Sequence, residues 1–401
     1  MNETPSDSAR ASASSAILLL SIATFASAAT TRICDALLPQ LASEFQVTPG
    51  RAAIVVMAYS FTYGLMQPPF GILGDRLGKY RIILACCIAS IATTAACALS
   101  ATLEGLAIAR LTSGIAAAAI VPLSIAWIGD VVDYSERQTT IARYMMGQVA
   151  GLISGQAFGG WIGEQFGWRS PFVIIVALYV IASAGLAREL KINPLTRDVP
   201  TSANDKGMFA TFASALRRPQ VRRVLAACFI EGFLCFGASA YITTMLHQRF
   251  GMSFGQAGLA LAAFGAGGLA YAVSARHVVP RLGETGVAQL AAGLFLVSFG
   301  ALAFAPTPWL AAPACFGAGA AYYLVHSVLQ VNASQMTPDA RGSGMALFAT
   351  CFFLGQAMGV ALAAPLVDAL GTTPIFAIAA ITLPILSLLV AAGVANGGRP
   401  A

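Results

Sequence analysis

Apolar stretches as long as a membrane-spanning helix follow one another through almost the whole chain. A bilayer core about 30 Å thick is crossed by about 20 helical residues. Inside lipid the backbone has to satisfy its own hydrogen bonds, so spanning segments of this kind fold as helices. The sequence therefore predicts an all-α membrane protein with twelve spans. They lie near residues 14–43, 50–71, 81–101, 104–129, 138–163, 169–189, 221–247, 254–276, 285–305, 308–332, 342–367 and 373–395.

Charge is scarce in this sequence. Of its 401 residues, 57% are hydrophobic and 10% are charged, and the mean hydropathy is +0.75. A soluble domain carries about 25% charged residues, so lipid has to be the main solvent of this chain. The first apolar stretch is too long for a cleaved signal peptide and eleven more follow, so we expect it to remain as the first helix.

The basic residues are unevenly divided between the connecting segments. If the N-terminus is cytoplasmic, 18 Lys and Arg residues fall in cytoplasmic segments, three in outer loops and two within spans. Cytoplasmic loops of membrane proteins carry such an excess. We therefore expect a multi-pass protein of the inner (plasma) membrane with both termini cytoplasmic. The same rule explains the pI near 9.0 without a nucleic-acid partner.

The chain divides into two similar halves around its longest polar segment. "RLG" at 76–78 recurs at 281–283, and "GQAFG" at 155–159 recurs as "GQAMG" at 355–359. Each pair occupies the equivalent place in its half, which indicates a duplicated six-helix unit. The expected units are a tail (1–13), a six-helix bundle (14–189), a cytoplasmic loop (190–220), a second six-helix bundle (221–395) and a tail (396–401).

The loop after the second span, "GILGDRLGKYR" at 71–81, concentrates charge and glycine. It resembles the signature loop of the major facilitator superfamily, G-x-L-A-D-R-x-G-R-K-x-x-L. It departs from that pattern at Gly74, Lys79, Tyr80 and Ile83. The resemblance implies twelve helices in two pseudo-symmetric bundles, and a secondary transporter whose substrate site lies between the halves near the midplane.

The resemblance also implies a role for this loop. In the family, its aspartate faces the positive N-terminal end of the eleventh helix, which begins here near residue 341. The basic residues would bind acidic groups at the end of the fourth helix. The alternative is a turn that only retains positive charge on the cytoplasmic side. The predicted conformational latch comprises Gly71, Asp75, Arg76, Gly78, Lys79 and Asp130.

The fifth span carries a glycine every four residues, at Gly147, Gly151, Gly155 and Gly159. These glycines share one helix face, where another helix can approach closely, and we expect them to support rocking of tightly packed halves. The segment "GLISGQAFGG" resembles the antiporter motif G-x-x-x-G-P-x-x-G-G, but Gln156 replaces its proline. "CDALLPQL" in the first span resembles a signature of drug:proton antiporters. The missing proline argues against antiport, whereas the signature in the first span favours it.

Charged side chains within spans are costly and usually functional. Arg32 and Asp35 lie in the first span and Arg110 lies in the fourth. Asp35 and Arg110 lie at similar depths, so we expect an ion pair between them in the cavity wall. The alternative is a local pair between Arg32 and Asp35, with Arg110 bound to backbone carbonyls.

Glu231 lies near the middle of the seventh span with no basic residue close to it in sequence. Burial of a carboxylate without a partner favours its protonated form, which suits a group that carries protons. The alternative is a protonated glutamate hydrogen-bonded to a neighbouring helix. Glu231 and Asp35 are the candidates for proton coupling. His326, in the tenth span, is expected to be a hydrogen-bonded core residue.

The function best supported by these features is secondary active transport of a small organic compound by alternating access, with proton-coupled efflux. The alternative is a proton-coupled importer or a uniporter of a metabolite or siderophore. A membrane enzyme or sensor fits poorly, because the sequence has no nucleophile–base pair, no P-loop and no loop long enough for a domain. We expect no catalytic residue, metal or cofactor. The expected state is a monomer whose partners are its substrate, protons and the bilayer.

The latch hypothesis predicts that Asp75→Asn lowers the transport rate without preventing insertion. A carboxylate at a helix N-terminus contributes about 0.3–2 kcal/mol, enough to shift a balanced conformational equilibrium. The measurement is the initial rate in inverted vesicles after a pH jump, with a substrate found by screening. Wild-type kinetics in Asp75→Asn would contradict the latch.

Overall fold

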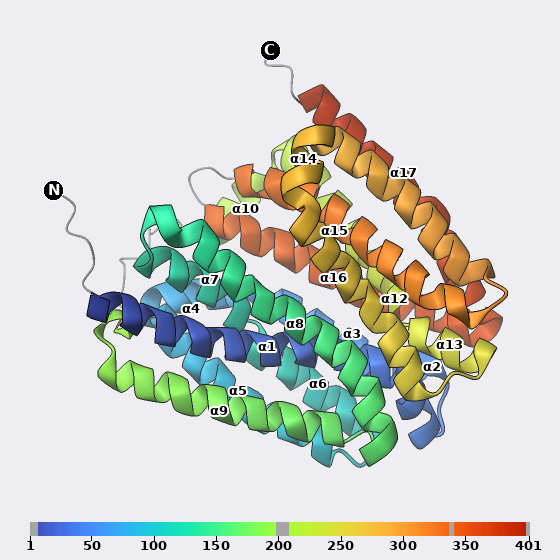
Figure 1. Ribbon diagram of the computed structural model, residues 1–401, viewed down its shortest axis with the longest axis horizontal. Coiled ribbons are helices and arrows are strands. Elements are labelled where there is room, and N and C mark those ends of the chain that lie inside the picture. The colour runs from blue at the N-terminus through green and yellow to red at the C-terminus, as the bar shows by residue number, and fades with distance from the viewer. Residues whose placement is uncertain (1–6, 198–207, 337–340, 398–401) are drawn as a thin grey trace.

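The computed structural model describes residues 7–197, 208–336 and 341–397, and within these ranges every regular element is a helix (Figure 1). The first half contains α1 (Asp7–Glu44), α2 (Pro49–Ala52), α3 (Ile54–Leu65), α4 (Gln67–Leu77), α5 (Lys79–Leu99), α6 (Leu103–Ala117), α7 (Ile120–Val131), α8 (Tyr134–Phe166) and α9 (Ser170–Ile192). The connecting segment contains η1 (Pro194–Thr196) and α10 (Met208–Leu216).

The second half contains α11 (Pro219–Glu231), η2 (Gly232–Phe236), α12 (Gly237–Ser239), α13 (Ile242–Phe250), α14 (Phe254–Phe304), η3 (Pro308–Leu310), α15 (Ala311–Gln335), α16 (Arg341–Leu370) and α17 (Thr373–Gly397). The two halves lie side by side in Figure 1, with α8 next to α14 and α3 next to α16. The prediction of an all-α membrane protein is therefore confirmed.

The described helices agree with twelve spans. The described residues form nine continuous or nearly continuous helices that are long and apolar enough to cross a membrane, and some of these combine several of the labelled elements. One of the nine, α14, holds two predicted spans that meet at Gly283, where φ is +62° and the helix breaks. The second span is divided among α2, α3 and α4, and the fifth is α8, which is rich in glycine and glutamine. With α14 counted as two spans, and with the second and fifth spans added, the total agrees with the predicted twelve.

Proline explains the division of the second and fourth spans. Pro68 and Pro69 stand at the start of α4 and lack amide hydrogens, so the second span breaks there. Pro122 likewise cannot donate to the carbonyl of Ala118, between α6 and α7. The side chain of Gln67 donates to this carbonyl at 3.2 Å. A polar side chain thus satisfies a backbone group that proline leaves without its helical partner.

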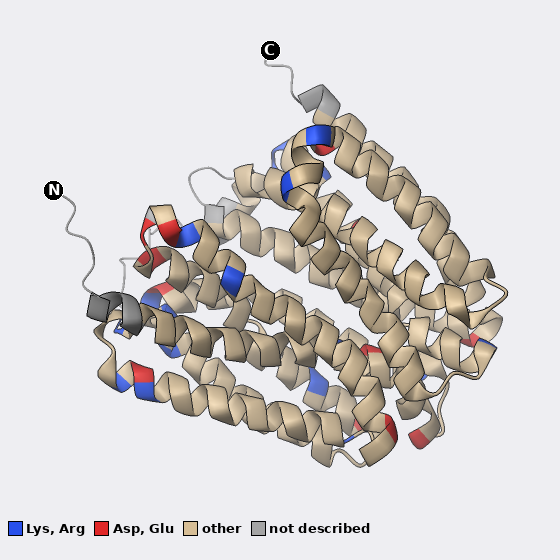
Figure 2. Cartoon of the chain, viewed as in Figure 1, with Lys and Arg blue, Asp and Glu red and all other residues tan. Residues whose placement is uncertain are grey.

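Charged residues gather at the helix ends, and long stretches of most helices carry none (Figure 2). This is the distribution expected of helices surrounded by lipid. An even number of spans places both chain termini on one side of the molecule. We call that side, which the sequence predicts to be cytoplasmic, the inner side, and the opposite side the outer side.

Two boundaries differ from the sequence prediction. The first helix begins at Asp7, within the predicted tail of residues 1–13. The predicted loop of residues 190–220 contains the helix α10, while its residues 198–207 lie outside the described structure. Hydropathy detects the lipid-facing part of a helix, so it misses turns that extend into water.

The glycine face of α8 packs against α1. A Cβ atom on Gly151 would collide with the carbonyl oxygen of Phe25, and one on Gly155 would lie 2.6 Å from that of Ala29. The close approach predicted for this face is present. Its partner, however, belongs to the same half, so the expected contribution to rocking between halves is wrong. Gly147 and Gly159 contact α1 in the same way, and the four glycines hold the first half together.

This packing predicts that Gly151→Val destabilises the protein. The added side chain would collide with the α1 backbone, and overpacking of this kind costs about 1–3 kcal/mol. The measurement is the melting temperature of the purified protein in detergent. The control is Gly293→Ala in α14, where an added Cβ atom has no neighbour within 4 Å. Equal melting temperatures for the two variants would contradict the packing argument.

Candidate functional site

Arg32 and Asp35 form a buried ion pair on α1. Arg32 Nη1 lies 3.2 Å from Asp35 Oδ2, and both side chains are less than 10% exposed. Arg32 Cζ also lies 4.0 Å from the ring centroid of Phe236, in η2 of the other half. The guanidinium therefore joins a carboxylate of the first half to an aromatic face of the second.

The backbone of Asp35 also contacts the second half. Pro39 lies four residues after Asp35 and cannot donate to its carbonyl. Thr243 of α13 donates its hydroxyl to that carbonyl at 2.7 Å. The proline of "CDALLPQL" thus leaves an acceptor free for a hydrogen bond between the halves.

Arg110 is fully buried and does not pair with Asp35. It donates through Nη1 to the carbonyl of Thr30 at 3.0 Å and through Nε to the carbonyl of Val55 at 3.3 Å. Its Cζ lies 4.1 Å from the ring centroid of Tyr59. The predicted ion pair between Asp35 and Arg110 is therefore wrong. Asp35 has a cation one helical turn away, and backbone carbonyls bind Arg110, as in the alternative considered from the sequence.

Glu231 has a partner that the sequence prediction missed. Its Oε2 lies 2.8 Å from Nδ1 of His326, on α15, and the glutamate is completely buried. The expectation of a carboxylate without a partner is wrong, and the hydrogen bond to a neighbouring helix agrees with the alternative considered from the sequence. His326 is hydrogen-bonded, as expected, but the sequence did not identify its partner. The two residues are 95 positions apart, so only the packing of α11 against α15 brings them together. Either the imidazole N–H donates to the carboxylate, or the carboxyl O–H donates to the imidazole nitrogen.

A π-helical segment, η2, begins at the residue after Glu231. Such segments widen a helix locally and are frequent at functional sites. Here η2 carries Phe236, whose ring lies 5.0 Å from Tyr322 and 5.5 Å from Phe352 between centroids. His326 also lies 5.0 Å from each of these last two rings. The Glu231–His326 pair is therefore enclosed by aromatic side chains.

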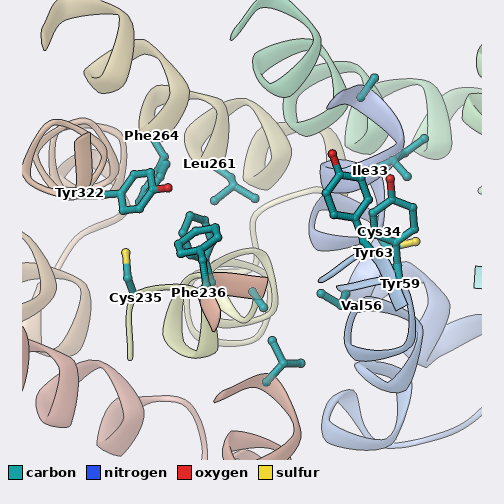
Figure 3. Packing of buried hydrophobic residues seen from close by; sticks show 14 of the residues in the cluster. Ile33, Cys34, Val56, Tyr59, Tyr63, Cys235, Phe236, Leu261, Phe264 and Tyr322 are labelled. Atoms are coloured by element: carbon teal, nitrogen blue, oxygen red, sulfur yellow. The ribbon is translucent and has the colours of Figure 1, made fainter. Parts of the chain in front are cut away.

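Aromatic residues of both halves face the boundary between them. Figure 3 shows Phe236 and Tyr322 of the second half on one side, and Tyr59 and Tyr63 of the first half on the other. Tyr59 and Tyr63 stack with centroids 5.6 Å apart, and Tyr63 lies 4.5 Å from Phe353 of α16. These rings provide an apolar boundary that carries a few hydroxyl groups.

Asp35 and Glu231 each keep one carboxylate oxygen free of protein hydrogen bonds. Within the described ranges, Asp35 Oδ1 and Glu231 Oε1 are buried and have no partner. Arg110 Nη2 and the amide oxygens of Gln156 and Gln356 are in the same situation. Free carboxylate oxygens in such surroundings can accept a proton or a donor group of a substrate.

The structure places the predicted latch at the inner end of the first half. Lys79 Nζ lies 2.6 Å from Asp130 Oδ2 and 3.7 Å from Asp75 Oδ1. Gly78 has φ of +95°, a conformation that favours glycine. Arg76 is exposed and Gly71 has open space around its α-carbon. The expected partner of Asp75 is the N-terminal end of α16, which begins at Arg341 and contacts α4. Residues 337–340 and the side chain of Arg341 lie outside the described structure, so the contact of Asp75 with this helix end stays a prediction.

Within the described part of the chain, no three His, Cys, Asp or Glu side chains are placed to hold a metal ion. The arrangement instead offers two buried acid–base groups, Arg32–Asp35 and Glu231–His326, on opposite sides of one boundary. Groups of this kind bind and exchange protons and polar ligands.

The sequence profile of the Major Facilitator Superfamily matches residues 20–360. The uncharacterised MFS-type transporter YwfA of Bacillus subtilis is 25% identical over 355 residues, 88% of this chain and 86% of YwfA. The putative multidrug resistance protein MdtD of Salmonella typhi is 30% identical over 156 residues, 38% of this chain and 33% of MdtD. Among solved structures, the nucleoside transporter NupG superposes with a TM-score of 0.74 at 15% identity, covering 96% of this chain and 100% of NupG.

The contacts of Arg110 predict that Arg110→Lys destabilises the protein and retains transport only in part. A lysine cannot reproduce the planar fork that serves two carbonyls and stacks on Tyr59, and losing a buried charge-assisted hydrogen bond costs about 1.5–3 kcal/mol. The measurement is the melting temperature in detergent. The control is Arg51→Lys, at an exposed ion pair with Glu104. A melting temperature of Arg110→Lys as high as that of Arg51→Lys would contradict this account.

Proposed function

This chain belongs to the Major Facilitator Superfamily, and we propose that it is a proton-coupled exporter of a small, partly apolar organic compound. Family membership means that the protein is a secondary transporter of small molecules across a membrane and not an enzyme. The proposal adds proton coupling, direction and substrate class, and it places the protein in the inner membrane with cytoplasmic termini.

The observation that carries the proposal is the buried pair of Glu231 and His326. A coupling group has to gain a proton from one side of the membrane and release it to the other. Glu231 and His326 share a hydrogen bond of 2.8 Å in which either can hold the proton. Glu231 Oε1 has no protein partner in the described structure, so the carboxylate can accept a proton without breaking that bond. Of the two candidate carboxylates, Glu231 therefore suits coupling better than Asp35, because its histidine partner can take or give the proton, whereas the guanidinium of Arg32 beside Asp35 stays protonated.

The surroundings of this pair support a partly apolar substrate. The rings of Phe236, Tyr322 and Phe352 lie next to His326 or its neighbours, and Arg32 reaches Phe236 from the other half. Binding sites for small organic molecules combine mostly apolar walls with a few placed polar groups. In this proposal Asp35 and Arg32 change partners when substrate enters, and Asp35 acts as a gating group.

The proposed direction of transport is export. Export is supported by the partial similarity to a putative multidrug resistance protein and by the "CDALLPQL" segment around Asp35. The alternative is a proton-coupled importer or a uniporter of a metabolite or siderophore. Gln156 in place of the antiporter proline favours that alternative, as does the structural similarity to a nucleoside transporter. The loop around Asp75, Lys79 and Asp130 is proposed to stabilise one conformation of the cycle from the inner side.

The proposal predicts that Glu231→Gln abolishes gradient-driven accumulation but keeps substrate exchange. A neutral amide cannot release a proton, so binding and conformational change continue without coupling. The measurement compares uptake into inverted vesicles after a pH jump with exchange in the absence of a gradient. The substrate is one identified by screening a panel of compounds on the parent protein.

Two further variants sharpen this test. Asp35→Asn should reduce both modes if Asp35 acts in gating. Glu104→Gln is the control, because Glu104 is exposed at the outer side and pairs with Arg51. Wild-type accumulation in both Glu231→Gln and Asp35→Asn would overturn coupling through either carboxylate and favour a uniporter.

A further inference from the structure

The outer end of α16 is joined to the start of the second span by a carboxylate. Asp368 Oδ1 accepts a hydrogen bond from the backbone N–H of Gly50 at 2.8 Å, and its Oδ2 accepts one from the hydroxyl of Thr48 at 2.7 Å. Thr48 is the N-cap of α2, and hydrogen bonds from Ala53 to Pro49 and from Met57 to Ala53 continue the helix into α3. Asp368 thus caps a helix of the opposite half.

The outer end of α8 makes the equivalent contact with α14. Glu164 Oε2 accepts from the backbone N–H of Gly255 at 2.7 Å and from the hydroxyl of Ser253 at 2.8 Å. Ser253 is the N-cap of α14 and forms a capping box with Gln256. A carboxylate of the first half here caps a helix of the second half. The free N–H groups and partial positive charge of a helix N-terminus stabilise an anion at this place.

The two contacts are related by the internal repeat of the chain. Thr48 and Gly50 precede Ser253 and Gly255 by 205 residues each, which is also the offset between the two "RLG" segments. Each half therefore supplies one carboxylate from its fifth helix and one capped N-terminus from its second helix. We call these contacts the outer clamps.

A side chain in place of the glycine in either outer clamp would crowd the carboxylate. A Cβ atom on Gly50 would lie 2.5 Å from Asp368 Oδ2 and 2.5 Å from the carbonyl oxygen of Ala364. A Cβ atom on Gly255 would lie 2.7 Å from Glu164 Oε2. The absence of a side chain at each position leaves room for the carboxylate to reach the amide. In each outer clamp a glycine two residues after the N-cap donates its backbone N–H to the carboxylate of the other half.

The other carboxylates on the outer side do not join the halves. Glu104 pairs with Arg51 at 2.9 Å, and Glu44 pairs with Arg169 at 3.5 Å, all within the first half. In Figure 1, α2 and α13 lie at the end of the molecule away from both termini, where α8 and α14 also meet. Of the four carboxylates on the outer side, Glu44 and Glu104 therefore form ion pairs within the first half. Glu164 and Asp368 form hydrogen bonds that link the two halves.

We propose that Glu164 and Asp368 are positioning residues of the transport cycle. Their two outer clamps hold the outer side closed and must both break before that side opens. The contacts involve backbone amides and N-cap hydroxyls, so no basic side chain is needed. This inference rests on alternating access in general and does not depend on proton coupling or on the identity of the substrate.

The test measures the distance between the halves at the outer side without any substrate. Spin labels are attached at Ser43→Cys on α1 and Gln248→Cys on α13, exposed positions that line one outer pocket. Seven of the eight native cysteines are buried, and the chain without the two engineered cysteines gives the background labelling. Double electron–electron resonance on the protein in liposomes then reports the populations of short and long distances between the two spin labels.

We expect Glu164→Gln with Asp368→Asn to raise the ratio of long to short distances about tenfold, and either change alone about threefold. Gly50→Ala and Gly255→Ala keep both carboxylates but block their approach, and should act in the same direction. The control variants Glu44→Gln and Glu104→Gln should leave the ratio unchanged. An unchanged ratio in the double variant and in both glycine variants, or an equal rise in the controls, would overturn the proposal.

Discussion

A backbone carbonyl inside a bilayer has to find a hydrogen-bond donor, because lipid offers none. Pro122 and Pro39 each remove such a donor, and for both the replacement comes from another helix. Gln67 donates to Ala118 within the first half, and Thr243 donates to Asp35 across the two halves. Helix irregularities that would weaken a single span therefore become the contacts that connect spans.

The same constraint governs the buried charges. Arg110 is bound by carbonyls and an aromatic ring, Arg32 by a carboxylate and another ring, and Glu231 by an imidazole. A buried ion without partners is expensive in lipid, so none of these groups can move far without a replacement partner. Substrate, protons and the opposite half are the replacements that a transport cycle provides. A conformational change that separates one of these buried charges from its partner therefore requires a new partner for that charge.

The sequence predicted the spans well, because hydropathy follows directly from burial in lipid. It predicted the site less well, because spacing gives the depth of a residue but not the direction in which its side chain points. Asp35 and Arg110 lie at similar depths yet bind different partners. Glu231 and His326 are 95 residues apart, and only helix packing reveals their pairing. The glycine face of α8 predicted a close helix contact, but not that its partner would be α1.

The hydrogen bond from Thr243 reaches the backbone oxygen of Asp35 and leaves the carboxylate untouched. The bond therefore does not require a charge on that side chain. A proton can join or leave the carboxylate while the two halves stay attached at this point. Ionisation and attachment occupy the same residue but use different atoms, so a change in the charge of Asp35 does not in itself remove the contact between α1 and α13.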